Sequence, residues 1–229
     1  MGTDDIFKNR KGMRRKRKES NIARKPYRYL IICEGVKTEP NYFRGIKQRV
    51  DVKYREYIDV FDRIEIDIDG TGRNTQDLVN YAIKKRSLSD IPYGHTWVIF
   101  DKDEFTDEQF NNAIKQAIDN DIKVGWSNES IELWFLLHFE FMNTAINRHQ
   151  YIEKLNEHFK RLGINKGKYK KNMNNIFEIL MNEGSISNAI YWSKKLVENY
   201  KCGSVFPESK MNPCTVVYEL VEELLKYLK

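Results

Sequence analysis

The fold of this chain is decided by the sequence YLIICEG at residues 29–35. Residues 29–33 form a continuous apolar run, which is typical of a strand buried on both faces of a parallel sheet. Glu34 and Gly35 end the run, and the next residues favour a helix, with Thr38 as its N-cap and Pro40 close to its first turn. A buried strand followed by a helix is the first unit of an α/β fold.

Strands and helices are predicted to alternate up to about residue 126. Strands are expected at 57–68 (as one long strand or two short ones), 96–100 and 122–125, and helices at about 75–88, 107–120 and 131–137. Beyond His138 only helical periods appear, near 148–162, 172–182, 185–200 and 215–228. These patterns predict a mainly parallel, Rossmann-like sheet flanked by helices, with a helical C-terminal extension. The expected divisions are a disordered basic leader at 1–26, an α/β domain at 27–140, and a helical extension at 141–229 packed on that domain.

The positive charge of the chain is concentrated at its N-terminus. The 229 residues carry 39 Lys and Arg against 33 Asp and Glu, a net charge of +6. Residues 1–28 hold 11 bases and three acids, so they contribute +8 and the other 201 residues −2. The densest block is Arg14, Arg15, Lys16, Arg17 and Lys18. Such a leader is either a solvated arm or an arm that binds phosphates without reading sequence, and we favour a nucleic-acid partner.

Several classes of protein do not fit this composition. No apolar stretch approaches the ~18 residues of a membrane span, so we expect no membrane partner. The basic N-terminus lacks the apolar region of a secretory signal. Cys33, Cys202 and Cys214 lie too far apart for a zinc knuckle or a disulfide framework, and we expect a cytoplasmic protein.

Acidic residues follow two of the predicted strands. Glu34 and Glu39 come after the first strand, and Asp101 and Asp103 come after the strand at 96–100. Ligands of open α/β sheets bind at the carboxyl ends of the strands, where these side chains are expected. Carboxylates at the Asp101–Asp103 spacing suit Mg²⁺ or Mn²⁺, with Glu34 as general acid/base or as a further ligand. The alternative is an ordinary solvated turn at the strand end.

Five motifs of this chain, in the same order, resemble those of the RloB-like protein family, which is related to the abortive-infection protein AbiLii. They are the segment 30–43 (LIICEGVKTEPNYF), residues 72–75 (GRNT), Trp97 to Asp103, residues 127–134 (SNESIELW) running into His138-Phe139, and residues 212–215 (NPCT). The basic leader also resembles that family. Two positions depart from the family pattern: Glu129 stands where a Pro is usual, and Cys214 where a Ser is usual.

The resemblance implies a Toprim-like fold and a function in antiviral defence by abortive infection. By analogy with Toprim domains, metal binding falls to Asp101 and Asp103 and acid/base chemistry to Glu34. The expected activity is Mg²⁺-dependent cleavage of phosphodiester bonds in DNA or RNA. Two alternatives stay open: a catalytically silent nucleic-acid-binding or sensor module that acts through a defence-system protein partner, and a nucleotidyl transferase using the same acids.

Further candidate residues each have an ordinary structural explanation. The loop Gly72, Arg73, Asn74 and Thr75 precedes a helix and could hold a phosphate, or it is a turn in which Thr75 is the N-cap. Lys37 could neutralise a phosphate or a carboxylate, or be a surface lysine.

Glu132 lies among apolar residues, so its carboxylate needs a partner or a metal. Glu129 is expected on the same helical face, three residues earlier. Both are candidates for an additional acidic site with Glu39, and the alternative is a charge that interacts with the helix dipole. His138 is expected to be an ordinary core or surface histidine.

Overall fold

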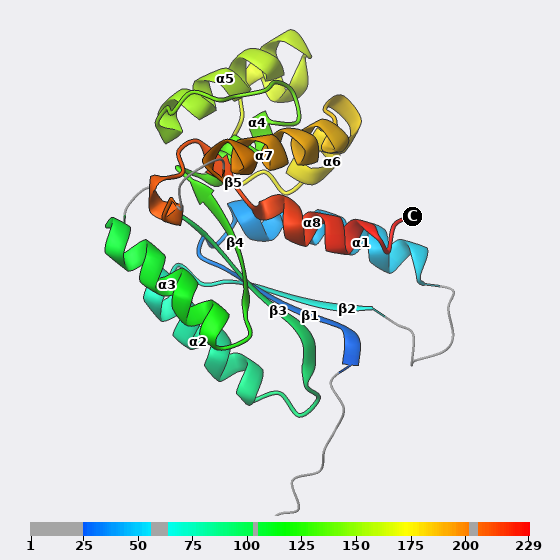
Figure 1. Cartoon of the computed structure of the whole chain (residues 1–229). Coiled ribbons are helices and arrows are strands. Elements are labelled where there is room, and N and C mark those ends of the chain that lie inside the picture. The colour runs from blue at the N-terminus through cyan, green and yellow to red at the C-terminus, as the bar shows by residue number, and fades with distance from the viewer. Residues whose placement is uncertain (1–24, 56–63, 103–104, 202–205) are drawn as a thin grey trace, which may run out of the picture.

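The structure is a computed structural model that describes residues 25–55, 64–102, 105–201 and 206–229. Its centre is a five-stranded sheet in the order β2-β1-β3-β4-β5 (Figure 1). The strands are β1 (Lys25–Cys33), β2 (Glu65–Gly70), β3 (Tyr93–Asp101), β4 (Lys123–Asn128) and β5 (Cys214–Thr215). The first four are parallel, and β5 is antiparallel to β4. The predicted α/β class, with a mainly parallel sheet flanked by helices, is therefore confirmed.

Helices cover both faces of this sheet. They are α1 (Thr38–Lys53), α2 (Thr75–Ser87), α3 (Asp107–Asp119), α4 (Ile131–Leu136), α5 (Arg148–Arg161), α6 (Ile176–Glu183), α7 (Ile186–Lys201) and α8 (Val217–Leu225), with short 3₁₀ helices η2 (Ile164–Gly167) and η3 (Glu208–Lys210). Helices α2 and α3 lie on one face and α1 and α8 on the other, while α4 to α7 gather beyond the carboxyl ends of the strands (Figure 1). Within the described ranges, no helix is long and apolar enough to cross a membrane.

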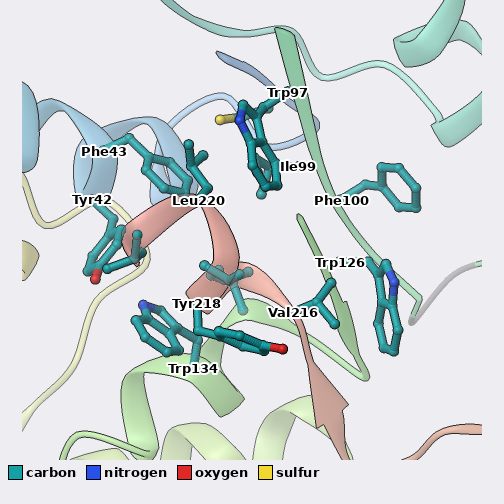
Figure 2. Close-up of a cluster of buried hydrophobic side chains, with 14 of the residues drawn as sticks. Tyr42, Phe43, Trp97, Ile99, Phe100, Trp126, Trp134, Val216, Tyr218 and Leu220 are labelled. Atoms are coloured by element: carbon teal, nitrogen blue, oxygen red, sulfur yellow. The ribbon is translucent and has the colours of Figure 1, made fainter. Parts of the chain in front are cut away.

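The core joins the two ends of the sequence. Trp97 and Ile99 of β3 face Phe43 of α1 and Leu220 of α8, while Phe100 points to the opposite face (Figure 2). All five side chains are buried, with at most 1% of their surface exposed. The C-terminal helix α8 thus covers the sheet together with the first helix of the chain.

The sheet differs from the prediction in one added strand and in the bounds of the others: β3 begins three residues early, at Tyr93, and β4 runs three residues further, to Asn128. Strand β5 lies in a region where only helices were expected, because two residues are too short for a recognisable period. Strand β1 begins at Lys25, four residues before the apolar run at 29–33 that predicted it. Strand β2 begins at Glu65 and runs to Gly70, and the earlier part of the predicted strand, residues 57–63, lies outside the described residues.

Two helix caps also differ from the prediction. Thr38 is the first residue of α1 rather than its cap, and its Oγ1 donates to the backbone oxygen of Lys171 at 2.7 Å. Asn74, not Thr75, caps α2, since its Oδ1 accepts the Asp77 N–H at 3.0 Å. Asn can reach the N–H groups of the first turn from the cap position, which leaves Thr75 as a buried helical residue.

Candidate functional site

The sheet has its topological switch point between β1 and β3. These strands are neighbours, but α1, which follows β1, lies on one face, while α3, which follows β3, lies on the other (Figure 1). Ligands of open α/β sheets bind in the crevice outside such a pair of carboxyl ends. Glu34 follows β1 directly and Asp101 ends β3, so both stand at this crevice.

Backbone hydrogen bonds fix Glu34 beside Asp101. The Glu34 N–H donates to the Ile99 oxygen at 2.9 Å, and the Gly72 N–H donates to the Glu34 oxygen at 2.8 Å. The Asp101 N–H in turn donates to Glu34 Oε2 at 3.2 Å. The Asp101 side chain is buried and that of Glu34 is half-buried. The structure therefore brings together the acids that follow the first and third strands.

The helical extension adds an arginine and a tyrosine to these acids. Arg148, the first residue of α5, donates from Nη2 to Asp101 Oδ2 at 2.6 Å, and its Nε lies 3.4 Å from Glu132 Oε2. Tyr169 donates its hydroxyl to Glu132 Oε1 at 3.2 Å. Glu132 is only 1% exposed, and burying an unpaired carboxylate is costly. The partner that the sequence required for Glu132 thus comes from beyond the α/β domain.

Glu39 is the fourth acid of the cluster and lies in the first turn of α1. It is 5% exposed, and its Oε2 is a buried oxygen with no hydrogen-bond partner in the described part of the chain. Burial raises the pKa of Glu39, and the nearby Glu132 carboxylate adds to the rise, while Arg148 and Lys171 oppose it. Glu34, Glu39, Asp101 and Glu132 form what we call the acidic site.

Other predicted residues lie outside this cluster. Asp103 and the leader block from Arg14 to Lys18 fall outside the described residues. Lys37 is exposed. Glu129 precedes α4, which begins at Ile131, so the expectation that Glu129 and Glu132 share a helical face is wrong.

The loop between β2 and α2, residues 70–75, lies beside the acidic site and contributes no acid to it. Gly70 is required there, because a Cβ atom would lie 2.6 Å from Pro40 Cγ and 2.7 Å from the Gly35 oxygen. Gly72 has a φ of 64°, which favours glycine. The Arg73 guanidinium stacks over the Tyr81 ring, with its Cζ 4.6 Å from the ring centroid. Arg73 is exposed and precedes α2.

The motif at residues 127–134 has a structural role that the sequence did not reveal. Ser127 Oγ lies 2.9 Å from Thr215 Oγ1, and Asn128 Nδ2 donates to the Ser209 oxygen at 3.0 Å. The Asn128–Glu129 peptide bond that follows is cis. The fourth and fifth motifs therefore pair with each other through β4 and β5, directly before the chain reaches Glu132.

The chemistry of the acidic site suits a hard divalent cation. In the described ranges, which exclude Asp103, no group of three or more His, Cys, Asp and Glu side chains is placed to hold a metal ion. However, the Arg148 guanidinium contacts both Asp101 and Glu132, and Glu39 Oε2 is a buried oxygen with no hydrogen-bond partner among the described residues. Carboxylate oxygens are the ligands that Mg²⁺ and Mn²⁺ prefer, so the donor set fits either ion.

Comparison with known protein families identified a match. A model of the RloB-like protein family matches residues 29–224, which span the sheet, the helices around it and the acidic site. No curated protein and no solved structure matches the chain.

Proposed function

This chain belongs to the RloB-like protein family, and from that membership and the acidic site we propose that it is a Mg²⁺-dependent enzyme that cleaves phosphodiester bonds in nucleic acid. We further propose that it has a Toprim-type centre and serves antiviral defence by abortive infection. The observation that carries the proposal is the pairing of Glu34 with Asp101, 3.2 Å from the carboxylate oxygen to the backbone nitrogen, at the switch point of the sheet.

The proposed centre divides its tasks among few residues. Asp101, Asp103 and Glu34 would hold the cation, which would stabilise negative charge on the phosphate and lower the pKa of a water molecule. Glu34 is half-buried, so its carboxylate can accept a proton from an attacking water at the mouth of the crevice. Arg148 is 27% exposed and orients the Asp101 carboxylate through the 2.6 Å bond. Glu132 holds Arg148 from the other side.

The test is the substitution Asp101→Asn, measured as cleavage of labelled DNA and RNA oligonucleotides in Mg²⁺ or Mn²⁺. We expect activity to fall by about 100-fold or more, since the charge that holds the cation is lost. Asp119→Asn, an exposed Asp at the end of α3, is the matched control and should cleave like the wild type. If Asp101→Asn keeps metal-dependent cleavage, the proposed mechanism is wrong.

One observation favours a second candidate, a silent nucleic-acid-binding or sensor module that acts through a protein partner. Asp101 Oδ2 already contacts a cation, the Arg148 guanidinium. A module of this kind would bind nucleic acid equally well with EDTA and with Mg²⁺ and would turn nothing over. A thermal shift with nucleotides and Mg²⁺ would distinguish both candidates from a nucleotidyl transferase, which alone should be stabilised by the small substrate.

A further inference from the structure

A second concentration of positive charge lies in the helical extension, far from the leader in sequence. Residues 160–171, which we call the basic segment, hold six bases and no acid: Lys160, Arg161, Lys166, Lys168, Lys170 and Lys171. All six side chains are exposed. The segment comprises the end of α5, the 3₁₀ helix η2 and the residues after it, of which Lys168 is extended.

The basic segment is anchored directly to the acidic site. Tyr169 is buried and donates its hydroxyl to Glu132 Oε1 at 3.2 Å, while the residues on either side of it, Lys168 and Lys170, are exposed. Side chains alternate in direction along an extended chain, so the inward tyrosine sets both lysines outward. Nucleic acid bound to Lys168 and Lys170 would therefore lie next to Tyr169, whose hydroxyl contacts Glu132 of the acidic site.

A second anchor joins the basic segment to the start of α1. Thr38 Oγ1 donates to the Lys171 oxygen at 2.7 Å, and Asn41 Nδ2 donates to Asn174 Oδ1 at 3.0 Å. Lys37 precedes Thr38 and Arg44 donates to Asn41 Oδ1 at 3.1 Å, and both bases are exposed. The positive surface therefore continues from the basic segment onto the helix that carries Glu39.

The bases of the basic segment are not paired with an acid within the described part of the fold, although Lys171 acts electrostatically on Glu39 and opposes the rise in its pKa. None of its six bases forms an ion pair with a carboxylate among the residues the structure describes, although Arg161 hydrogen-bonds to His158. Elsewhere lysines of the extension are paired, as Lys154 is with Glu140 and Lys194 with Glu222. Six exposed bases without an acid produce a local positive field that attracts polyanions.

We propose that the basic segment binds the phosphate backbone of a nucleic acid and holds it beside the acidic site. That the bound polyanion is a nucleic acid rests on the proposed function. The basic segment and the acidic site then have different roles. The exposed lysines attract phosphates, whereas the buried carboxylates repel a phosphate unless a cation lies between them. Binding to the segment should depend on salt and not on base sequence.

The experiment compares two triple variants of the full chain in EDTA. Lys166, Lys168 and Lys170 are changed to Gln in the first, and in the matched control the exposed Lys115, Lys201 and Lys226, which lie on α3, on α7 and at the end of α8, are changed to Gln. Fluorescence anisotropy with a labelled single-stranded RNA of about 20 nucleotides, and with the DNA of the same sequence, gives affinity as a function of KCl concentration. Comparing the two probes distinguishes RNA from DNA.

We expect the first variant to lose about 10-fold or more in affinity and the control about 2-fold or less. The slope of log affinity against log salt should become shallower by about 0.7 for each lost phosphate contact. Equal binding by the two variants, no binding by the wild type, or equally strong binding of poly-glutamate would overturn the proposal. If the first variant loses affinity but the wild type cleaves no nucleic acid, only the proposed enzymatic function is rejected. If the wild type cleaves and the first variant binds as well as the wild type, only the proposed role of the basic segment is rejected.

Discussion

Gly35 has no side chain because the Glu39 carboxyl group occupies the space where a side chain would lie. A Cβ atom on Gly35 would be 2.0 Å from Glu39 Oε2, well inside van der Waals contact. The obstacle is the far end of a flexible side chain, so it can move aside. Gly45 is different, since a Cβ there would lie 2.5 Å from Cβ of Phe177, close to the backbone of α6.

Substitutions at these two glycines should therefore affect metal binding and stability differently. We expect Gly35→Ala to change the free energy of unfolding by less than about 1 kcal/mol but to weaken Mn²⁺ binding by about 10-fold, because Glu39 is displaced. Gly45→Ala should cost about 1–3 kcal/mol from overpacking, partly offset by the helix propensity of Ala, with Mn²⁺ affinity unchanged. Urea unfolding and calorimetric titration measure both. Unchanged Mn²⁺ affinity in Gly35→Ala would remove Glu39 from the site.

His138 is a second residue whose environment has a measurable consequence. It is 2% exposed, and its Nδ1 lies 2.9 Å from the Trp134 oxygen, a geometry in which Nδ1–H donates. Burial lowers the pKa of His138 to about 4, against the opposing effect of backbone hydrogen bonds. The unfolded chain, with an ordinary histidine pKa, therefore binds a proton at a higher pH than the folded chain does.

The folded state should accordingly lose stability as the pH falls below about 6.5. From this residue alone we expect a loss of about 3 kcal/mol between about pH 7 and pH 4. His138→Asn keeps an N–H donor but cannot titrate. The test is urea unfolding over this range: the wild type should lose stability relative to His138→Asn as the pH falls. Parallel curves would show that His138 binds a proton as readily in the folded protein as in the unfolded chain.

At the scale of elements, the sequence predicted the strands and helices that are marked by a pattern within their own residues. The apolar run of β1, the stripe of α1 and the run of β3 each needed no information from elsewhere in the chain. Strand β5 could not be found in this way, since its two residues pair with Ser127 and Asn128 more than 80 residues earlier. Arg148 and Tyr169 reach the acidic site only through the packing of the helical extension, so no local pattern marked them.

The β4–β5 pairing carries a prediction about buried hydroxyl groups. Thr215 Oγ1 lies 2.9 Å from Ser127 Oγ and donates to the Trp126 oxygen at 3.2 Å. Thr215→Val removes the partner of the buried Ser127 hydroxyl, while the Trp126 oxygen still accepts the Val216 N–H at 2.9 Å, and it should cost about 1–3 kcal/mol of unfolding free energy. Thr75 Oγ1 is buried without a hydrogen-bond partner in the described ranges, so Thr75→Val should be neutral or stabilising. Equal effects in chemical denaturation would contradict this difference.

At the scale of the whole molecule, the net positive charge lies in the residues before β1. Residues 1–24 hold nine bases and three acids, a net +6, which leaves 30 bases and 30 acids in residues 25–229. The rest of the chain is thus neutral overall, yet it has a basic segment on its surface and an acidic site buried beside it. Sequence alone predicted the leader and the order of the acids but not the basic segment, whose meaning depends on the Tyr169–Glu132 contact.

Deleting residues 1–24 should separate the contributions of the two basic regions. All the described strands and helices begin at Lys25 or later, so we expect an unchanged unfolding midpoint. Affinity for the labelled oligonucleotide should fall by about 10-fold or more, with a shallower salt dependence, because fewer counterions are released. The remaining binding should still depend on Lys166, Lys168 and Lys170. A full-length chain with the nine leader bases changed to Gln is the control that removes the charge of the leader but keeps its length. If this variant binds like the wild type, the leader does not act through its charge.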